Sequence, residues 1–241
     1  MKSFGWILLL GALVMTSCEY MGGKRTSGNG NIITEERSVG EFDRVEVHGA
    51  IDVYVSQGST APVKVEADEN LMKYIIVEER NHQLVVKTKN GYNLRPSKKL
   101  KVYLSSPHYS ELEVSGACNI IGENKISSDN RLTLGVSGAG DITMEADAPQ
   151  VEARISGSGN VDLKGNTRDF ELELSGAGKA RCYELLSENT EVDISGAGSA
   201  EVYASVRIDA RVSGAGNVRY KGDGSIGENK VSGAGSVKKV E

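Results

Sequence analysis

The chain has 241 residues, which is enough for one large or two small domains with a substantial hydrophobic core. Its net charge is −5 at pH 7, so the composition gives no indication of a nucleic acid as partner. Many of its 29 glycines belong to one tetrapeptide that recurs through the second half, and this repeat organises the rest of the chain.

The first 18 residues are typical of a bacterial targeting segment. Lys2 supplies a positive charge, residues 4–15 are apolar, and a small-residue ending leads to Cys18. The apolar run is too short to cross a bilayer as a helix. We therefore predict a cleaved signal peptide over residues 1–17.

Cys18 directly follows the small residues, and this arrangement resembles the lipobox of bacterial lipoproteins. The resemblance implies cleavage before Cys18 and acylation of both its thiol and its new amino group. Several acyl chains on one residue exceed what stable membrane attachment requires. We expect an outer-membrane lipoprotein of the cell envelope, on a side of that membrane that the sequence leaves open. The alternative is a secreted protein with a cysteine near its cleavage site by chance.

Residues 19–31 have the composition of a linker, with glycines, charged residues and asparagines. Segments of this kind behave as flexible chains. We therefore expect residues 18–31 to be a lipidated cysteine with a flexible tether, and residues 32–241 to be the folded domain.

Seven short segments between residues 32 and 110 alternate apolar and polar residues, as strands with one buried face do. Turn-forming residues separate them, and residues 69–74 are the one place for a helical turn. Residues 47–51 (Val-His-Gly-Ala-Ile) look like a degenerate first copy of the repeat, so this half belongs to the same β-structure. The expected strands cover residues 32–36, 44–47, 51–56, 63–67, 75–79, 84–88 and 100–105.

The second half repeats Ser-Gly-Ala-Gly, with small variations, at a spacing of 18 to 22 residues. A period of this length is typical of a solenoid. Apolar residues stand at odd distances before and after each serine, so a period of two runs through the motif. Both glycines fall on these inward positions, which indicates a sharp bend or a close approach of two backbones. The copies begin at Ser115, Ser137, Ser156, Ser175, Ser195, Ser213 and Ser232.

Outward positions of the repeat carry opposite charges at intervals of one coil. Stacked coils bring such residues about 4.8 Å apart, where opposite charges stabilise the pairing by tenths of a kcal/mol. We predict a right-handed parallel β-helix or β-solenoid, all-β, with about seven coils over residues 111–241 and a continuing β-rich region over residues 32–110. The charge pairs are Asp162 with Arg181, Arg181 with Glu201, Glu201 with Arg219, Arg154 with Glu173, and Asp193 with Arg211.

Cys118 and Cys182 lie three coils apart, which is roughly 14 Å along the solenoid axis. A disulfide needs Cα atoms within about 7 Å of each other. We expect both thiols to be free, with Cys182 a small buried hydrophobe and Cys118 in a position that glycine fills elsewhere.

The sequence shows no constellation for catalysis. His48, His82 and His108 are far apart and lack the spacing of a metal site. The motif serines lack the following helix and the base that a nucleophile elbow requires.

A column of carboxylates occupies the position four residues before the motif serine. Like charges at one-coil spacing are unfavourable, so one hypothesis is a bound Ca²⁺, which prefers carboxylate oxygens. The other is a solvated edge screened by salt, with no metal or other cofactor. The column consists of Glu111, Thr133, Glu152, Glu171, Glu191 and Asp209, of which the last four are the candidate Ca²⁺ ligands.

Two further features suggest ligand faces. Tyr183 and Tyr203, each eight residues after a motif serine, either form a platform for a sugar or stack within the solenoid. The outward Ser and Ala residues of the motif make an uncharged strip, which either accepts another protein or a second copy of the chain, or packs under the N-terminal half.

Residues 41–53, 56–58 and 63–71, followed by the Ser-Gly-Ala-Gly series, resemble the family described as putative auto-transporter adhesin, head GIN domain. The resemblance covers about residues 32–238. It implies an all-β protein of β-helical character in an envelope lipoprotein, without an established biochemical activity, and it favours a binding role.

Two functions of different classes follow. The first is a non-catalytic, lipid-anchored envelope protein that presents a rigid head to an unknown protein or glycan, attached to the membrane through acylated Cys18 and either monomeric or oligomeric. The second is a pectinase-like enzyme acting on polysaccharides, which only the analogy of the fold supports. Glycoside hydrolysis needs a defined carboxylate pair in a cleft, whereas these carboxylates form a repeating column, so we favour the first.

Overall fold

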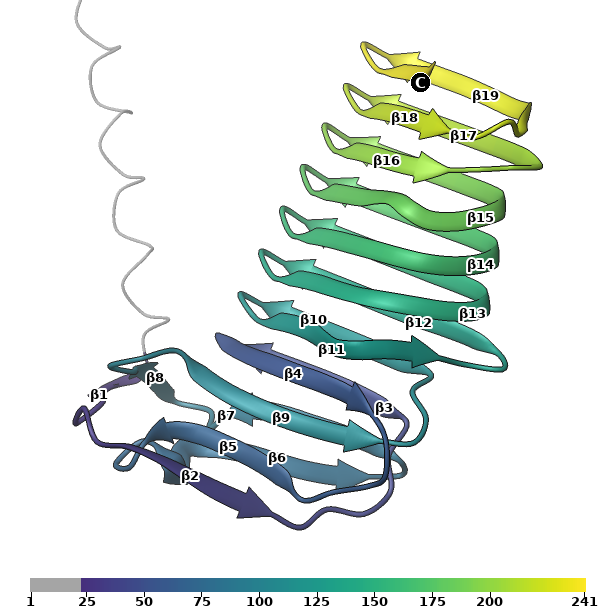
Figure 1. Cartoon of the computed structure of the whole chain (residues 1–241). Coiled ribbons are helices and arrows are strands. Elements are labelled where there is room, and N and C mark those ends of the chain that lie inside the picture. The colour runs from purple at the N-terminus through teal and green to yellow at the C-terminus, as the bar shows by residue number, and fades with distance from the viewer. Residues whose placement is uncertain (1–22) are drawn as a thin grey trace, which may run out of the picture.

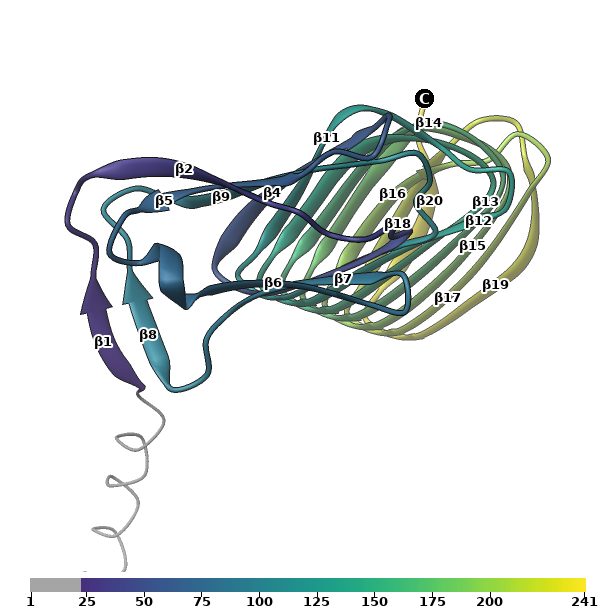
Figure 2. The same cartoon turned by 90° about the horizontal axis from the view of Figure 1, so that it is seen from below.

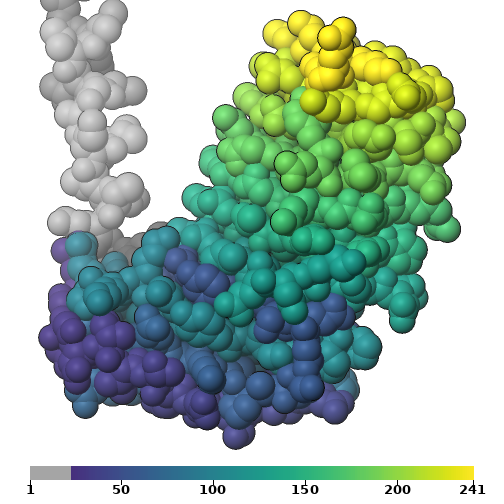
Figure 3. All heavy atoms as spheres, viewed as in Figure 1, coloured from purple at the N-terminus to yellow at the C-terminus, as the bar shows by residue number. Residues whose placement is uncertain are grey.

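The computed structural model describes residues 23–241, and the predicted signal peptide and Cys18 lie outside this range. The described chain consists almost entirely of strands and forms a parallel β-solenoid, as the repeat predicts (Figure 1). Successive coils lie on one another as bands from the N-terminal to the C-terminal end (Figure 3). Within residues 23–241, no helix has the length and apolar character needed to cross a membrane.

Each coil contributes to two rows of strands, which enclose the core between them (Figure 2). The motif row holds the strands that end in Ser-Gly: β10 (Glu111–Gly116), β12 (Arg131–Gly138), β13 (Asp141–Gly157), β14 (Asn160–Gly176), β15 (Lys179–Gly196), β17 (Arg207–Gly214) and β19 (Ser225–Gly233). The second row adds β11 (Asn119–Ser127), β16 (Ser199–Tyr203), β18 (Asn217–Lys221) and β20 (Ser236–Lys239). The long strands β13, β14 and β15 run through both rows, since residues 141–147 of β13 pair with β11 and residues 150–157 pair with β12.

The coils stack in register. Arg181 is the Cα partner of both Asp162 and Glu201, and its Nη1 lies 2.9 Å from Asp162 Oδ1. Leu172 faces the core with 1% of its surface exposed. These observations confirm that residues about nineteen apart become neighbours. The solenoid has about six turns, slightly fewer than the seven coils predicted, because a turn is complete only when the next copy of the motif is reached.

The two glycines of each motif differ, which corrects the prediction that both face inward. Gly176 has a φ of +118° and is partly exposed, because the chain turns there, whereas Gly178 is buried. A Cβ atom on either glycine would collide with the carbonyl oxygen of the equivalent glycine one coil earlier, Gly157 or Gly159. The predicted close approach of two backbones is confirmed.

The N-terminal half continues the solenoid and then closes its end. Its strands are β1 (Lys24–Ser27), β2 (Ile32–Arg37), β3 (Arg44–Gly49), β4 (Ile51–Gln57), β5 (Val63–Asp68), β6 (Ile75–Arg80), β7 (Gln83–Thr88), β8 (Tyr92–Arg95) and β9 (Leu100–Ser106), with the predicted helical turn present as the 3₁₀ turn η1 (Met72–Tyr74). β3 pairs in parallel with β10 and places His48 beside Ser115, which confirms residues 47–51 as a degenerate first copy. β7 and β9 extend the two rows, and antiparallel pairing of β2, β5 and β6 ends them.

The predicted tether is ordered from residue 24 onward, so that part of the prediction is wrong. β1 pairs in parallel with β8, and the Lys24 N–H donates to the Gly91 carbonyl at 2.7 Å. The Gly30 N–H donates to Asp68 Oδ1 at 2.7 Å. Composition does not reveal such contacts, because they are made by main-chain groups of an otherwise polar segment.

Candidate binding groove

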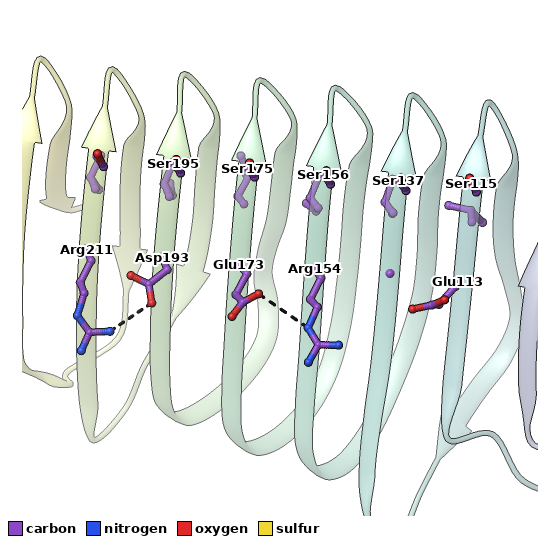
Figure 4. A pocket seen from close by; sticks show the side chains of 18 of the residues that line it. Glu113, Ser115, Ser137, Arg154, Ser156, Glu173, Ser175, Asp193, Ser195 and Arg211 are labelled. Carbon is purple, nitrogen blue, oxygen red and sulfur yellow. Dashed lines mark hydrogen bonds and ion pairs between the residues drawn. The ribbon is translucent and has the colours of Figure 1, made fainter.

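A groove of about 1100 Å³ runs across the coils on the motif row (Figure 4). The motif serines line it, one from each coil. They point outward because the apolar residue before each serine, such as Leu174 before Ser175, is buried in the core. We call this feature the serine groove. Its lining includes Ser115, Ser137, Ser156, Ser175, Ser195, Ser213 and Ser232, with His48 at the N-terminal end.

The serine groove is open to solvent. Ser156, Ser175 and Ser195 are all exposed, and the N-terminal half lies at one end of the solenoid and not over this face (Figure 1). Of the two alternatives for the uncharged strip, packing under the N-terminal half is therefore wrong. The strip is available to a ligand along its length.

A row of charged side chains borders the serines on the same strands. These residues stand two positions before the motif serines, except at Ser137, where Gly135 takes the place, and by the alternation of a strand they share the outward face of the serines. The ion pairs within the row link neighbouring coils (Figure 4). Its members are Glu113, Arg154, Glu173, Asp193, Arg211 and Lys230, with Arg154 Nε 3.8 Å from Glu173 Oε2 and Arg211 Nη1 3.2 Å from Asp193 Oδ2.

The N-terminal end of the charged row is acidic. Glu113 and Glu46 are Cα partners of like charge, and Glu113 leans over Gly135, where a Cβ atom would lie 3.1 Å from Glu113 Cγ. Burial, together with the charges of Glu111 and Glu46, raises the pKa of Glu113. His48 Nε2 lies 2.8 Å from Glu46 Oε1. The groove therefore changes along its length from an acidic end to a centre of paired charges.

Arginines neutralise much of the predicted carboxylate column. Glu152 is buried and contacts two arginines, Arg131 and Arg154. Burial and the charge of Glu152 raise the pKa of Glu171. No group of three His, Cys, Asp or Glu side chains in residues 23–241 is placed to hold a metal ion, so the Ca²⁺ hypothesis stays a prediction that this geometry does not favour. The pairs at 2.6 Å are Arg131 Nη1 with Glu152 Oε2, Arg211 Nη1 with Glu191 Oε1 and Arg207 Nε with Asp209 Oδ2.

Tyr183 lies on the second row, in a smaller hollow of about 460 Å³ that Asp162 and Arg181 also line. The predicted stacking on Tyr203 is absent from the aromatic pairs of the described chain, and the Lys221 ammonium instead lies 5.3 Å from the Tyr183 ring centroid. A register shift after Arg181 explains this difference, because it displaces Tyr183 along the strand. A ligand at the two tyrosines stays a prediction.

The two cysteines of the described chain are buried and free, as predicted. Burial raises the pKa of the Cys182 thiol to about 12 and also raises the pKa of Cys118. Neither thiol is therefore a nucleophile at neutral pH, and neither lies in the groove.

Residues 41–224 match the family model described as putative auto-transporter adhesin, head GIN domain. The chain belongs to this family. Membership indicates an adhesin-like binding head of the cell envelope or surface, which agrees with an open groove on a rigid solenoid. No curated protein matches the chain.

Solved structures of similar proteins share the fold. A putative adhesin from Bacteroides fragilis NCTC 9343 is 23% identical with a TM-score of 0.81, covering 89% of this chain and 100% of that chain. Two proteins from Parabacteroides distasonis ATCC 8503 each align over 90% of this chain and 100% of their own. One is described as a putative lipid binding protein, at 25% identity and a TM-score of 0.76, and the other as a putative adhesin, at 26% and 0.72.

Sequence reasoning identified the serine strip and the charge pairs separately but did not join them into one groove. The sequence contains the signal for one groove, because the motif serine and the residue two positions before it lie on the same face of a strand. Sequence reasoning also missed Glu46 and His48 as the start of the groove. Because residues 47–51 are a copy of the motif, aligning them with the other copies places His48 at the serine position and Glu46 two residues before it.

Proposed function

We propose that this chain is a non-catalytic, lipid-anchored protein of the outer membrane whose serine groove binds a protein or glycan ligand in the manner of an adhesin head. The observation that carries the proposal is the open, continuous groove of about 1100 Å³. It repeats one hydroxyl and, on most coils, one charge at every step of the solenoid.

A rigid site of this kind suits an extended ligand. Neighbouring strands fix the spacing of the groups at about 4.8 Å, so little ordering of the protein is needed on binding. Hydroxyl groups both donate and accept hydrogen bonds, and the charged row adds direction. Oligomerisation through the same strip is the competing use of this face.

A binding screen against glycans and extracellular-matrix proteins tests the proposal. The chain from residue 19 to 241 contains every described residue and serves as the sample. We expect at least one ligand whose binding falls more than tenfold in Ser175→Tyr, because the larger side chain fills the centre of the serine groove. Asn166→Tyr, at an exposed position away from the groove, is the matched control and keeps full binding. Binding of the same ligand by Thr143→Tyr tests whether the hollow beside Tyr183 is the binding site instead.

Equal loss in Ser175→Tyr and Asn166→Tyr would overturn the groove as the binding site. Cleavage of polygalacturonate by the same sample, without any binding partner, would instead favour the enzyme. Mass spectrometry of the chain made in a bacterial envelope tests the anchor, with an acylated Cys18 expected and a Cys18→Ser variant released from the membrane.

A further inference from the structure

β1 and β8 form a two-stranded lobe on the N-terminal half, and Figures 1 and 2 show that it projects beyond the edge of the solenoid. Its residues and those of the adjoining turns are unusually basic. Lys64 and Lys99 nearby in sequence are paired with carboxylates, at 3.8 Å and 3.1 Å. By contrast, the five exposed cations of β1, η1, the turn before β8 and β8 itself make no ion pair with any residue in 23–241. They are Lys24, Arg25, Lys73, Lys89 and Arg95, and we call them the basic lobe.

Two tyrosines stand among these cations. The rings of Tyr74 and Tyr92 lie with their centroids 4.3 Å apart. The Lys73 ammonium is 5.3 Å from the Tyr74 ring centroid, and the Lys89 ammonium is 5.9 Å from that of Tyr92. Half-buried tyrosines beside long basic side chains are the combination that favours the interface between water and lipid headgroups.

The chain outside the structure ends close to this lobe. Only five residues separate Cys18 from Lys24, and the six steps between the two Cα atoms span about 20 Å when the chain is fully extended. Glu19 is the one acidic residue among them. A lipid on Cys18 therefore holds the start of the basic lobe within about 20 Å of the bilayer surface, which is two to three Debye lengths at physiological salt.

The rest of the chain has the opposite charge. The whole protein carries a net charge of −5, although the lobe alone contributes five cations. Anionic headgroups attract the lobe and repel the remainder, so the charge distribution also selects an orientation.

We propose that the basic lobe docks on the anionic headgroups of the bilayer that holds the lipid anchor, and that this contact fixes the orientation of the solenoid on the membrane. The choice of the membrane as the binding partner of the lobe rests on the lipid anchor of the proposed function. Each basic residue near an anionic surface contributes about fivefold to the affinity.

Vesicle binding by the unlipidated chain from residue 19 to 241 tests the contact without any acylation. We expect binding to vesicles that contain phosphatidylglycerol, weakening as salt rises, and none to phosphatidylcholine alone. Replacing Lys24, Lys73 and Lys89 together by Gln lowers the affinity by about 100-fold. The matched control replaces Lys179, Lys221 and Lys238 by Gln, with the same change in net charge, and leaves the affinity within about twofold.

A second measurement covers the case of weak binding by the free chain. Trp6 is the only tryptophan and precedes residue 19, so Tyr92→Trp gives a single reporter in the lobe. The chain is held on nickel-chelating lipid by an N-terminal histidine tag, and brominated lipids quench tryptophan that reaches the headgroups. We expect strong quenching with anionic vesicles, lost in the lobe variant and kept in the control.

An unquenched reporter on anionic vesicles, or equal effects of the two triple variants, would overturn the proposal. Preference for a soluble anionic protein over vesicles would point to a protein partner and overturn it as well. Both measurements bypass acylation. An unmodified Cys18 found by mass spectrometry would therefore refute the anchor alone, while an inert lobe beside an acylated Cys18 would refute the docking alone.

Discussion

The two halves of the molecule bring distant residues together in different ways. In residues 111–241 one rule applies throughout, since each residue lies beside the residue about nineteen positions away. In residues 23–110 strands of both directions pair, and individual polar side chains connect the loops. The solenoid coils therefore share one repeated backbone contact, whereas the N-terminal half adds contacts by individual side chains to its strand pairing.

This difference decides where each half is vulnerable. Gly176 represents the repeated contact, because its neighbour above and its neighbour below are also glycines of positive φ. Asp68 represents the specific contact, because it has no exposed surface and joins two loops. Substitutions at these positions break the two kinds of stability separately.

The largest effect is expected from Gly176→Ala. The residue would hold a φ of +118°, and its Cβ would collide with the Gly157 carbonyl oxygen, so the coils must separate. We expect a loss of about 3–5 kcal/mol in the free energy of unfolding, from backbone strain together with overpacking. Urea denaturation followed by circular dichroism measures it.

Gly30→Ala is the control in the N-terminal half. Its φ is +81°, but no atom lies within 4 Å of the position of the new Cβ. Strain alone should cost about 1–2 kcal/mol. Equal losses for the two glycine variants would show that the stacking of backbones is not what holds the solenoid.

The second prediction concerns Asp68→Asn. The carboxylate accepts the Gly30 N–H at 2.7 Å, the Ser97 N–H at 2.9 Å and the Ser97 hydroxyl at 2.6 Å. An amide keeps the size but loses the charge and one acceptor, so the free energy of unfolding should fall by about 2–3 kcal/mol. Amide hydrogen exchange should become faster first near Gly30, while the amides of the coils around Leu172 stay protected.

The same carboxylate predicts a pH dependence. Burial by itself raises the pKa of Asp68, but the hydrogen bonds from Ser97 and Gly30 outweigh it and hold the pKa below the ordinary value of 3.8. A carboxyl with a lowered folded-state pKa contributes stability above its unfolded pKa, and this contribution disappears as the pH falls through the folded-state pKa. The melting temperature should therefore drop below about pH 4, and drop less in Asp68→Asn. Parallel curves for both proteins would contradict this.

The smallest effect is expected from Arg181→Glu on the solenoid surface. The substitution replaces an ion pair with Asp162 by a row of three acids that includes Glu201. The cost should be about 1 kcal/mol at low salt and less at high salt. Lys179→Glu, two residues earlier with the same change in charge, should cost less than about 0.5 kcal/mol. An equal cost at both sites would deny the register-specific role of the pair.

The repeated half could be predicted from the sequence because its rule is periodic. Ser156 is the Cα partner of Ser175, and Arg181 lies where the period of the repeat puts it. The period of two does not hold at the first glycine of the motif, such as Gly176. A positive φ turns the chain there, so the path through the motif is not straight.

The N-terminal half was harder to predict wherever contacts are not periodic. β1 and β8 have no alternation of apolar and polar residues, so the sequence does not predict their pairing. The structure shows it through main-chain contacts such as the Lys24 N–H with the Gly91 carbonyl. In the smaller hollow, the sequence does contain a signal for the displacement of Tyr183. The interval from Ser175 to Ser195 is one residue longer than the two before it, and the extra residue produces the irregularity after Arg181.

The glycines stacked along the turns also bear on how such a chain changes in length. Each coil touches only the coil before and the coil after it, so gain or loss of one unit leaves every other step as it was. Recombination between two copies of the tetrapeptide would remove or insert such a unit at a seam where both backbones already match. The distance spanned by the hydroxyls then grows or shrinks in steps of about 4.8 Å, and related chains can be fitted to longer or shorter ligands by copy number alone.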